Sequence, residues 1–202
     1  LVEQPKLSPT TRSYELFGKH FLEQFAGKTD TDGTPLTTFK KGCAGFESVF
    51  YFHEGEGHQT VIQDLVITGG NNFNPGGGIC CENNTSPTIK NCHIVDNWCQ
   101  TVRGGGGIYI NGGNPVITGC TISGNTASSP PTMPTACGGG ICIWQPNCAS
   151  AKITHCTITD NHATMWGGGV YFNYGIPEND LRCDDYVSVI TCTISGNTAK
   201  EY

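Results

Sequence analysis

The sequence predicts an all-β fold in which the chain winds as a parallel β-helix, with a short amphipathic helix near its N-terminus. Three observations predict this fold. A glycine-rich box recurs along the chain, an apolar-x-Ile-x-x-Asn segment follows each box, and Gly, Asn and Pro separate short apolar runs within every repeat. Repeats of this length with period-two runs are typical of stacked β-coils, spaced by about 4.8 Å. We expect about five coils.

The recurring Ile-x-x-Asn segment defines the repeat. It begins with Cys in four copies and is degenerate in an earlier copy, residues 65–70. Its central isoleucines are separated by 27, 28, 36 and 36 residues, which indicates a fixed core with loops inserted in the later copies. The members are Cys92–Asn97, Cys120–Asn125, Cys156–Asn161 and Cys192–Asn197.

Each repeat contains three period-two runs, so we expect three strands per coil and three inward-facing apolar ladders. The ladders are Ile79, Ile108, Ile141 and Val170; Ile62, Ile89, Ile117, Ile153 and Ile190; and Ile67, Ile94, Ile122, Ile158 and Ile194. A fourth inward ladder joins Leu65 to Cys92, Cys120, Cys156 and Cys192. At a turn we expect an asparagine ladder in which each amide bonds its neighbours, formed by Asn97, Asn125, Asn161 and Asn197.

The N-terminal segment has a different pattern. Residues 1–12 contain two prolines and predict an extended arm, and residues 13–25 place aromatic and apolar side chains at helical spacing. Ser13 is a suitable N-cap and Gly27 a suitable helix stop. We therefore divide the chain into an arm and capping helix at 1–41 and a β-helix at 42–202.

Composition excludes some classes of partner and indicates a compartment. The formal net charge of −6 argues against a nucleic-acid surface, and the sequence has no apolar run long enough to span a membrane. Twelve cysteines without paired C-x-x-C spacing are typical of a disulfide-bearing exported protein. We expect an extracellular or cell-surface location.

The glycine boxes and the Asn segments together resemble the right-handed β-helix repeats of bacterial surface proteins. The nearest pattern is that of the polymorphic outer-membrane protein repeats, with GGA[IL] and FxxN boxes; here Ile replaces Phe. The boxes that match are Gly76–Ile79, Gly105–Ile108, Gly138–Ile141 and Gly167–Val170. The resemblance covers about residues 60–199 and implies a right-handed, pectate-lyase-like fold. That superfold includes adhesins, autotransporter passengers, phage tailspikes and polysaccharide lyases, so it leaves function open.

The cysteines have two interpretations. Stacked Cys in adjacent coils would have Cα atoms within disulfide range, but their parallel Cβ vectors do not converge, which favours free thiols used as small core side chains. Loop cysteines are better disulfide candidates: Cys148 with Cys183, Cys99 with Cys137, and Cys43 with Cys80 or Cys81.

Two stretches carry potential metal ligands. His53-Glu54-Gly55-Glu56-Gly57-His58 lacks the helical spacing of a zinc motif and is more typical of a turn. Asp30 and Asp32 could supply two oxygen ligands of a calcium loop, but the other ligands of such a loop are missing and a turn is the favoured interpretation. We expect no cofactor, with calcium as the alternative.

We find no convincing catalytic set. Asp96 and Asp160 lie two coils apart, but other copies have Gly at the same position, which indicates a left-handed turn rather than a pair of catalytic carboxylates. His93 and His155 project outward without a basic partner nearby in sequence. A polysaccharide lyase or glycoside hydrolase acting in a groove along the coils remains the alternative.

An aromatic column predicts a third kind of function. Tyr51, Tyr109 and Tyr171 should face outward beside the glycine boxes, with Trp144 close by, and aromatic faces can bind sugar rings or simply cover a sheet. A carbohydrate-binding module is therefore a further alternative.

The ends of a β-helix expose unpaired strand edges, which favour pairing. The sequence stops directly after a full repeat, so we expect either a longer rod or a second subunit at that end. The leading hypothesis is a non-enzymatic structural unit that associates end to end, as a filament subunit or as part of an adhesive surface rod.

Overall fold

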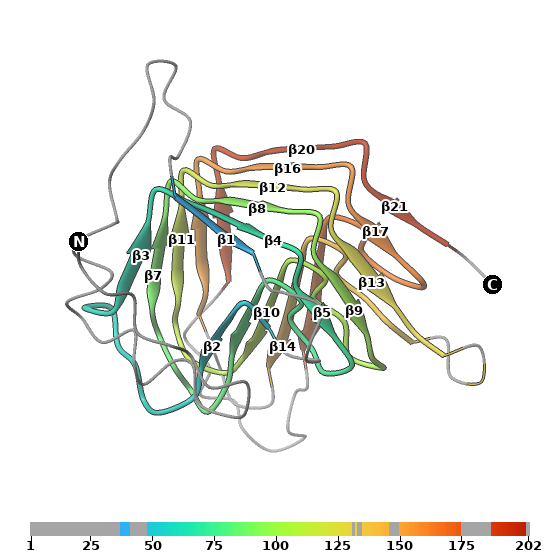
Figure 1. The fold of residues 1–202 in the computed structure, drawn as a ribbon, viewed down its shortest axis with the longest axis horizontal. Helices are drawn as coiled ribbons and strands as arrows, with labels where there is room; N and C mark the ends of the chain where they lie inside the picture. The colour runs from blue at the N-terminus through green and yellow to red at the C-terminus, as the bar shows by residue number, and fades with distance from the viewer. Residues whose placement is uncertain are drawn as a thin grey trace, which may run out of the picture.

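The fold is a stack of short parallel strands in four sheets. A computed structural model describes residues 37–40, 48–130, 132, 135–145, 150–174 and 187–200. Within these ranges every regular element is a β-strand and every strand pairing is parallel. Figure 1 shows the four sheets arranged around a common interior. This pattern confirms the all-β parallel coil.

Two of the sheets carry the first two strands of each coil. Sheet I follows the glycine boxes and contains β2 (Phe50–Phe52), β6 (Ile79–Cys81), β10 (Ile108–Asn111), β14 (Ile141–Gln145) and β18 (Val170–Tyr174). Sheet II contains β3 (Val61–Gln63), β7 (Thr88–Lys90), β11 (Val116–Thr118), β15 (Lys152–Thr154) and β19 (Ser188–Ile190).

The other two sheets flank the asparagine turn. Sheet III contains β1 (Thr37–Lys40), β4 (Leu65–Thr68), β8 (His93–Val95), β12 (Thr121–Ser123), β16 (Thr157–Thr159) and β20 (Thr193–Ser195). Sheet IV contains β5 (Asn71–Asn72), β9 (Trp98–Gln100), β13 (Thr126–Ser128), β17 (His162–Ala163) and β21 (Thr198–Ala199).

The interior is a set of isoleucine ladders, as the repeat predicts. Alternation along each strand sends one side chain inward, and the parallel register places equivalent residues beside one another. The predicted ladder from Ile79 to Val170 is in register across sheet I, and the ladder from Ile67 to Ile194 is in register across sheet III. The isoleucines of the inner coils are fully buried.

The prediction of Ile190 as a member of the second inward ladder is wrong, because Val189 occupies that position. Ile153 pairs with Val189, whereas Ile190 pairs with Thr154 on the outer side of sheet II. The physical reason is the constant spacing to the fourth ladder, because the inward residue of sheet II always lies three positions before the inward Leu or Cys. That spacing selects Val189 before Cys192, as it selects Ile153 before Cys156.

The number of strands per coil also differs from the prediction. The sequence predicts three, and the structure has four, because sheet IV forms after the asparagine turn. Its strands are two or three residues long and turn only a small side chain inward in the inner coils, such as Cys99, Ala127 and Ala163. Such segments have almost no apolar periodicity and are easily taken for a loop.

The asparagine ladder links the coils at the turn between sheets III and IV. Each amide group donates to the side-chain oxygen of the next asparagine, at 3.0 Å from Asn97 to Asn125, 2.9 Å from Asn125 to Asn161 and 2.9 Å from Asn161 to Asn197. The same amides donate to backbone carbonyls of the preceding coil, including Ile94 O at 2.8 Å from Asn125. The buried polar groups of this turn are thereby satisfied.

Some predictions concern residues that the structure does not describe. The capping helix at 13–25 lies outside the described residues, and the number of coils in the whole chain stays a prediction for the same reason. Strand β1 pairs with β4, so sheet III includes residues that precede the boundary placed at 41. No helix that is long and apolar enough to cross a bilayer occurs in the part of the chain that the structure describes.

Candidate functional site

The outer face of sheet I carries a column in which tyrosine alternates with cysteine. The parallel register aligns Tyr51, Cys80, Tyr109, Cys142 and Tyr171. These side chains pack on one another and on Cys137 and Trp144, in a cluster separate from the isoleucine core. The tyrosine–cysteine column is therefore a second apolar layer on the outside of the sheet.

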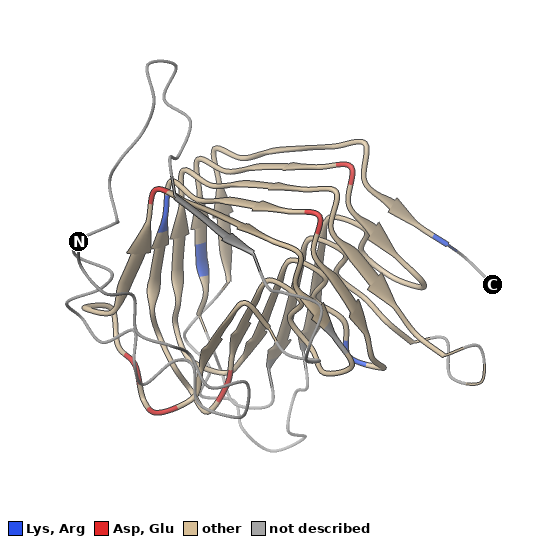
Figure 2. Ribbon diagram, viewed as in Figure 1, with Lys and Arg blue, Asp and Glu red and all other residues tan. Residues whose placement is uncertain are grey.

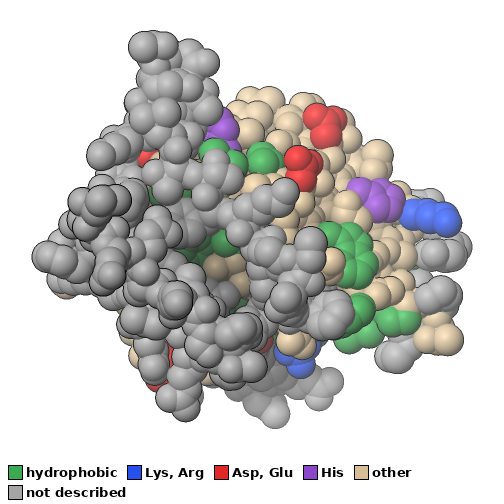
Figure 3. Space-filling view, viewed as in Figure 1, with side chains coloured by type: hydrophobic (Ala, Val, Ile, Leu, Met, Phe, Trp, Pro, Cys, Tyr) green, Lys and Arg blue, Asp and Glu red, His purple; other side chains and the backbone are tan. Residues whose placement is uncertain are grey.

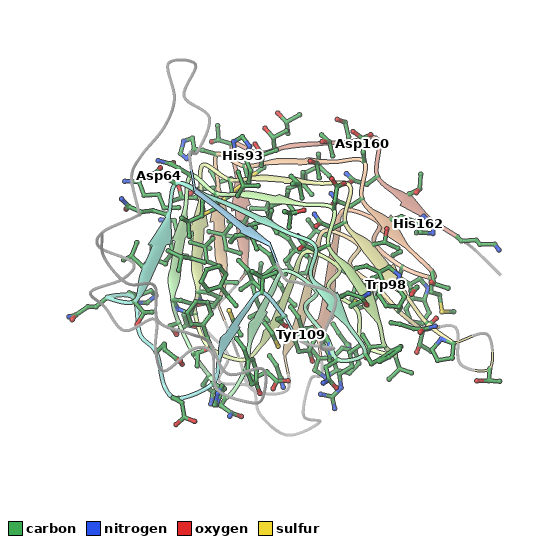
Figure 4. All side chains as sticks on the ribbon, in the orientation of Figure 1. Asp64, His93, Trp98, Tyr109, Asp160 and His162 are labelled. Atoms are coloured by element: carbon green, nitrogen blue, oxygen red, sulfur yellow. The ribbon has the colours of Figure 1, made fainter. Side chains whose placement is uncertain are left out.

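Tyr109 is at the centre of the column and is completely buried, although the sequence predicts it on an open sugar-binding face. Its side chain is 0% exposed, and no geometric hydrogen-bond partner for its hydroxyl lies among the residues that the structure describes. Burial raises the pKa of the Tyr109 phenol, and the nearby Arg103 guanidinium partly opposes that rise. Figure 4 marks its position on the sheet I side. Tyr109 thus supplies packing rather than a contact surface.

The exposed aromatic group of this face lies at the β18 end. Trp166 stacks on Tyr171, with ring centroids 6.0 Å apart and an interplanar angle of 13°, and Trp166 is 47% exposed. Tyr171 is predicted from the sequence, whereas Trp166 is not. Trp166 could have been found from its position directly before the glycine box Gly167–Val170. A residue in that position lies over the outward-facing side chain five residues later, here Tyr171.

The other end of the face is held by polar contacts. The Tyr51 hydroxyl donates to Glu82 Oε2 at 2.8 Å, and the Tyr51 ring stacks on His53 with centroids 4.3 Å apart. Burial and the Glu82 carboxylate raise the pKa of Tyr51 above its ordinary value. Trp144 is half-buried in the cluster of the column. Three of the four predicted aromatic residues therefore remain partly accessible, in different places along the sheet.

The two predicted metal-binding histidines have separate partners. His53 Nδ1 lies 3.0 Å from a Glu54 carboxylate oxygen, whereas His58 Nε2 lies 2.7 Å from the backbone oxygen of Asn114. In the described residues no three His, Cys, Asp or Glu side chains come together in a geometry that would hold a metal ion. Asp30 and Asp32 lie outside the described residues.

The paired carboxylates are turn residues. Asp96 and Asp160 have φ of 53° and 56°, and Gly69, Gly124 and Gly196 occupy the same left-handed position with φ between 64° and 70°. Both aspartates are exposed at the corner where sheet III ends; Figure 4 labels Asp160 there. Figure 2 shows that few charged residues lie on the strands. Asp96 and Asp160 therefore occupy a left-handed turn position, as the sequence predicts.

The two predicted outward histidines differ in role. His93 lies on β8 in register with Thr121, on a face that continues with Thr157 and Thr193, and it is half-buried. His155 is exposed and is itself a turn residue, with φ of 55°. Figure 4 labels His93 on the sheet III side of the coil. The space-filling view in Figure 3 shows scattered charged and histidine side chains on this side rather than a dense cluster.

All nine described cysteines are free thiols. The inward cysteines contact backbone groups, as where Cys120 Sγ accepts from the Cys92 amide at 3.4 Å. Burial raises the pKa of Cys99 to about 12. Of the disulfide candidates, Cys80, Cys99 and Cys137 are thiols in the structure, and Cys43, Cys148 and Cys183 lie outside the described residues.

Core side chains are exposed at the β18–β21 end of the described stack. Strands β18 to β21 are the terminal strands of the four sheets. Their inward positions are occupied by core residues that no further described coil covers, so Phe172 is 39%, Val189 37% and Ile194 50% exposed. Ile158, the partner of Ile194 one coil earlier, is 0% exposed. The end therefore presents both strand edges and core side chains.

Comparison with known proteins identifies the fold family. Residues 48–201 match the family described as the right handed beta helix region. No protein of curated function and no solved structure shows significant similarity to the chain. The match covers most of the chain and agrees with the four parallel sheets and the asparagine turn. The chain therefore belongs to the right-handed β-helix family.

Proposed function

We propose that this protein is a non-enzymatic structural β-helix unit that associates end to end, as a filament subunit or as part of a rod at the cell surface. The observation that carries the proposal is the open end formed by β18 to β21, with Val189 and Ile194 exposed at core positions. An extracellular or cell-surface location is part of the proposal. It rests on the cysteine-rich composition and on the resemblance to surface repeats.

Equivalent core residues differ in burial between the open end and the inner coils. Burying an isoleucine side chain contributes about 1.5–3 kcal/mol, and Ile194 gains only part of this because it is half exposed. The edge strands also present backbone groups that a further parallel strand would pair. A cover must therefore supply apolar side chains and strand edges at the same spacing, which another β-helix coil does.

A second copy of the chain can offer such a coil. Strands β2, β3 and β5 are terminal in sheets I, II and IV among the described residues. Contact between that end and the β18–β21 end joins two different surfaces, and such head-to-tail contacts propagate into linear assemblies.

The test is an assembly measurement on matched variants. Ile194→Lys places a charge on the open end. We expect the wild type to show a concentration-dependent increase in mass by light scattering, and Ile194→Lys to abolish this increase. Thr193→Lys is the control, because Thr193 lies on the same strand but on the outer face. It should assemble as the wild type does.

Two results would contradict the proposal. The first is a wild-type protein that stays monomeric over the whole concentration range and forms no fibres in electron micrographs. The second is equal assembly of the Ile194→Lys and wild-type proteins. Circular dichroism should show that both Lys variants keep their β structure.

A second candidate function, carbohydrate binding, is supported by the Trp166–Tyr171 stack. Two nearly parallel rings with the outer one 47% exposed make a flat apolar surface of the kind that stacks on sugar faces. Among the residues that the structure describes, no comparable geometry supports the alternative of a polysaccharide lyase or glycoside hydrolase acting in a groove along the coils.

Calorimetric titration with neutral and acidic polysaccharides tests this second function. We expect Trp166→Ala to weaken binding by about tenfold, the equivalent of one lost aromatic stacking contact. Trp98→Ala on sheet IV is the control, since Trp98 packs edge-on against Phe73 away from this stack. Absence of binding by the wild type, or equal binding by both variants, would remove the candidate.

A further inference from the structure

Cys142 of the tyrosine–cysteine column is in sulfur–sulfur contact with its buried neighbour Cys137. Cys137 Sγ and Cys142 Sγ are 3.7 Å apart, and both side chains are buried. Both thiols also lie close to one oxygen, the backbone carbonyl of Arg103, at 3.0 Å from Cys137 and 3.2 Å from Cys142. Their positions in the chain differ by only five residues.

The glycine box causes this approach. Gly138 has φ of 64°, and a Cβ atom placed on it would lie 2.6 Å from both Cα and Cβ of Cys142. The chain therefore folds directly over Cys142 and leaves the residue before the box, Cys137, beside it. The next coil repeats the arrangement, because Trp166 and Tyr171 occupy the same two positions and stack. The same close approach therefore occurs in two successive coils.

We propose that Cys137 and Cys142 form a disulfide that locks this turn when the chain folds in the presence of a small-molecule disulfide. One thiolate attacks the small disulfide, forms a mixed disulfide and releases one small thiol. The second cysteine then loses its proton and attacks the protein sulfur, which forms the Cys137–Cys142 bond and releases the second small thiol. Two protein thiols are oxidised and one small disulfide is reduced.

Burial determines when the reaction occurs. Contact with Cys137 and burial raise the pKa of Cys142 well above the ordinary value, so Cys142 is rarely a thiolate in the folded turn. We expect the bond to form while the turn is still open to solvent. Once the turn has closed, the bond is shielded from small thiols.

Differential alkylation of the full chain tests the pairing without any mutation. The reduced protein is refolded with oxidised glutathione and denatured in N-ethylmaleimide, which labels free thiols. It is then reduced and treated with iodoacetamide, which labels the thiols released from disulfides. We expect the iodoacetamide label on Cys137 and Cys142. Both lie in the tryptic peptide 104–152, so fragment-ion sequencing is needed to assign each label.

Variants separate this pair from the alternative predicted from sequence, Cys99 with Cys137. In Cys137→Ser, Cys142 should acquire the N-ethylmaleimide label, and in Cys99→Ser the labels on Cys137 and Cys142 should not change. Cys142→Ser gives the reciprocal test. The proposal is overturned if both cysteines of the refolded wild type carry N-ethylmaleimide. It is also overturned if Cys137 is paired with Cys99.

Discussion

At the scale of single residues, a left-handed turn position before the sheet III strands β4, β8, β12, β16 and β20 carries more strain than its surroundings. One residue per coil occupies it, with φ between 51° and 65°: Asp64, Asn91, Gly119, His155 and Thr191. Asp and Asn tolerate this conformation, Gly adopts it freely, and other side chains lose about 1–2 kcal/mol there. The repeat therefore keeps the backbone shape while the side chain varies.

Replacing His155 by glycine should stabilise the protein by about 0.5–1 kcal/mol, because relief of the left-handed strain outweighs the added freedom of the unfolded chain. Urea unfolding measures the change. His93→Gly is the matched control and should destabilise by about 1 kcal/mol, since His93 lies in an ordinary strand. Equal losses in the two variants would show that the turn at residue 155 is not strained.

The turn positions also show what a single sequence reveals at this scale. Alternation of Gly with Asp at Gly124 and Asp160 predicts the left-handed turn after sheet III, and the φ angles agree. Burial of Tyr109 was not predictable from its outward position, because a strand pattern gives the side of the sheet but not what packs outside it. Trp166 was missed because its partner lies five residues away, a spacing that belongs to neither strand nor helix.

At the scale of elements, the glycine box of one coil packs against the backbone of its neighbours. A Cβ atom on Gly106 would lie 2.5 Å from the carbonyl oxygen of Gly139 and 2.6 Å from that of Thr126. Gly106 therefore lets three backbone segments meet where sheets I and IV approach each other. No side chain fits without moving the backbone.

We expect Gly106→Ala to destabilise the protein by about 3 kcal/mol or to prevent folding, because the obstructing atoms belong to the backbone. Gly57→Ala is the control, since a Cβ atom there has open space and the glycine does not have a positive φ. Thermal unfolding of the two variants provides the comparison. A Gly106→Ala protein as stable as the control would mean that the coils can shift apart at little cost.

Element prediction succeeded where apolar periodicity was strong and failed where it was weak. The strands of sheets I and III could be predicted from the spacing of Ile and Gly residues alone. Sheet IV was missed because its inward residues are small, such as Ala127 and Ala163, and small residues carry little periodic signal. Ile190 was placed inward on its hydrophobicity, whereas the fixed distance to Cys192 selects Val189.

At the scale of the whole molecule, buried thiols link stability to alkaline pH. The pKa of Cys99 is about 12 in the folded protein and about 8.5 in an unfolded chain. Between these values the unfolded chain releases a proton that the folded protein retains, so the free energy of unfolding falls as pH rises. The stabilisation is fully present below about pH 8.5.

Cys99→Ala should reduce this alkaline loss, by up to about 1.4 kcal/mol for each pH unit above 9. Alanine is compatible with the position, because Ala127 and Ala163 follow Cys99 in the same ladder. The measurement is urea unfolding between pH 7 and 11. Ala163→Cys is the reciprocal variant and should steepen the loss; parallel curves for all three proteins would contradict the assignment.

The asparagine ladder gives the rod a direction. Each side-chain oxygen in it accepts from the N-terminal side, and the amide groups of Asn97, Asn125 and Asn161 each donate to the side-chain oxygen of the next asparagine, so that Asn197 is the last acceptor. A molecule approaching in the reverse orientation would bring donor against donor. Any fibre built on this pattern is therefore polar, with two chemically different tips. Growth at one tip need not have the rate of growth at the other, and a reagent that caps the Asn197 tip would leave the opposite tip free to elongate.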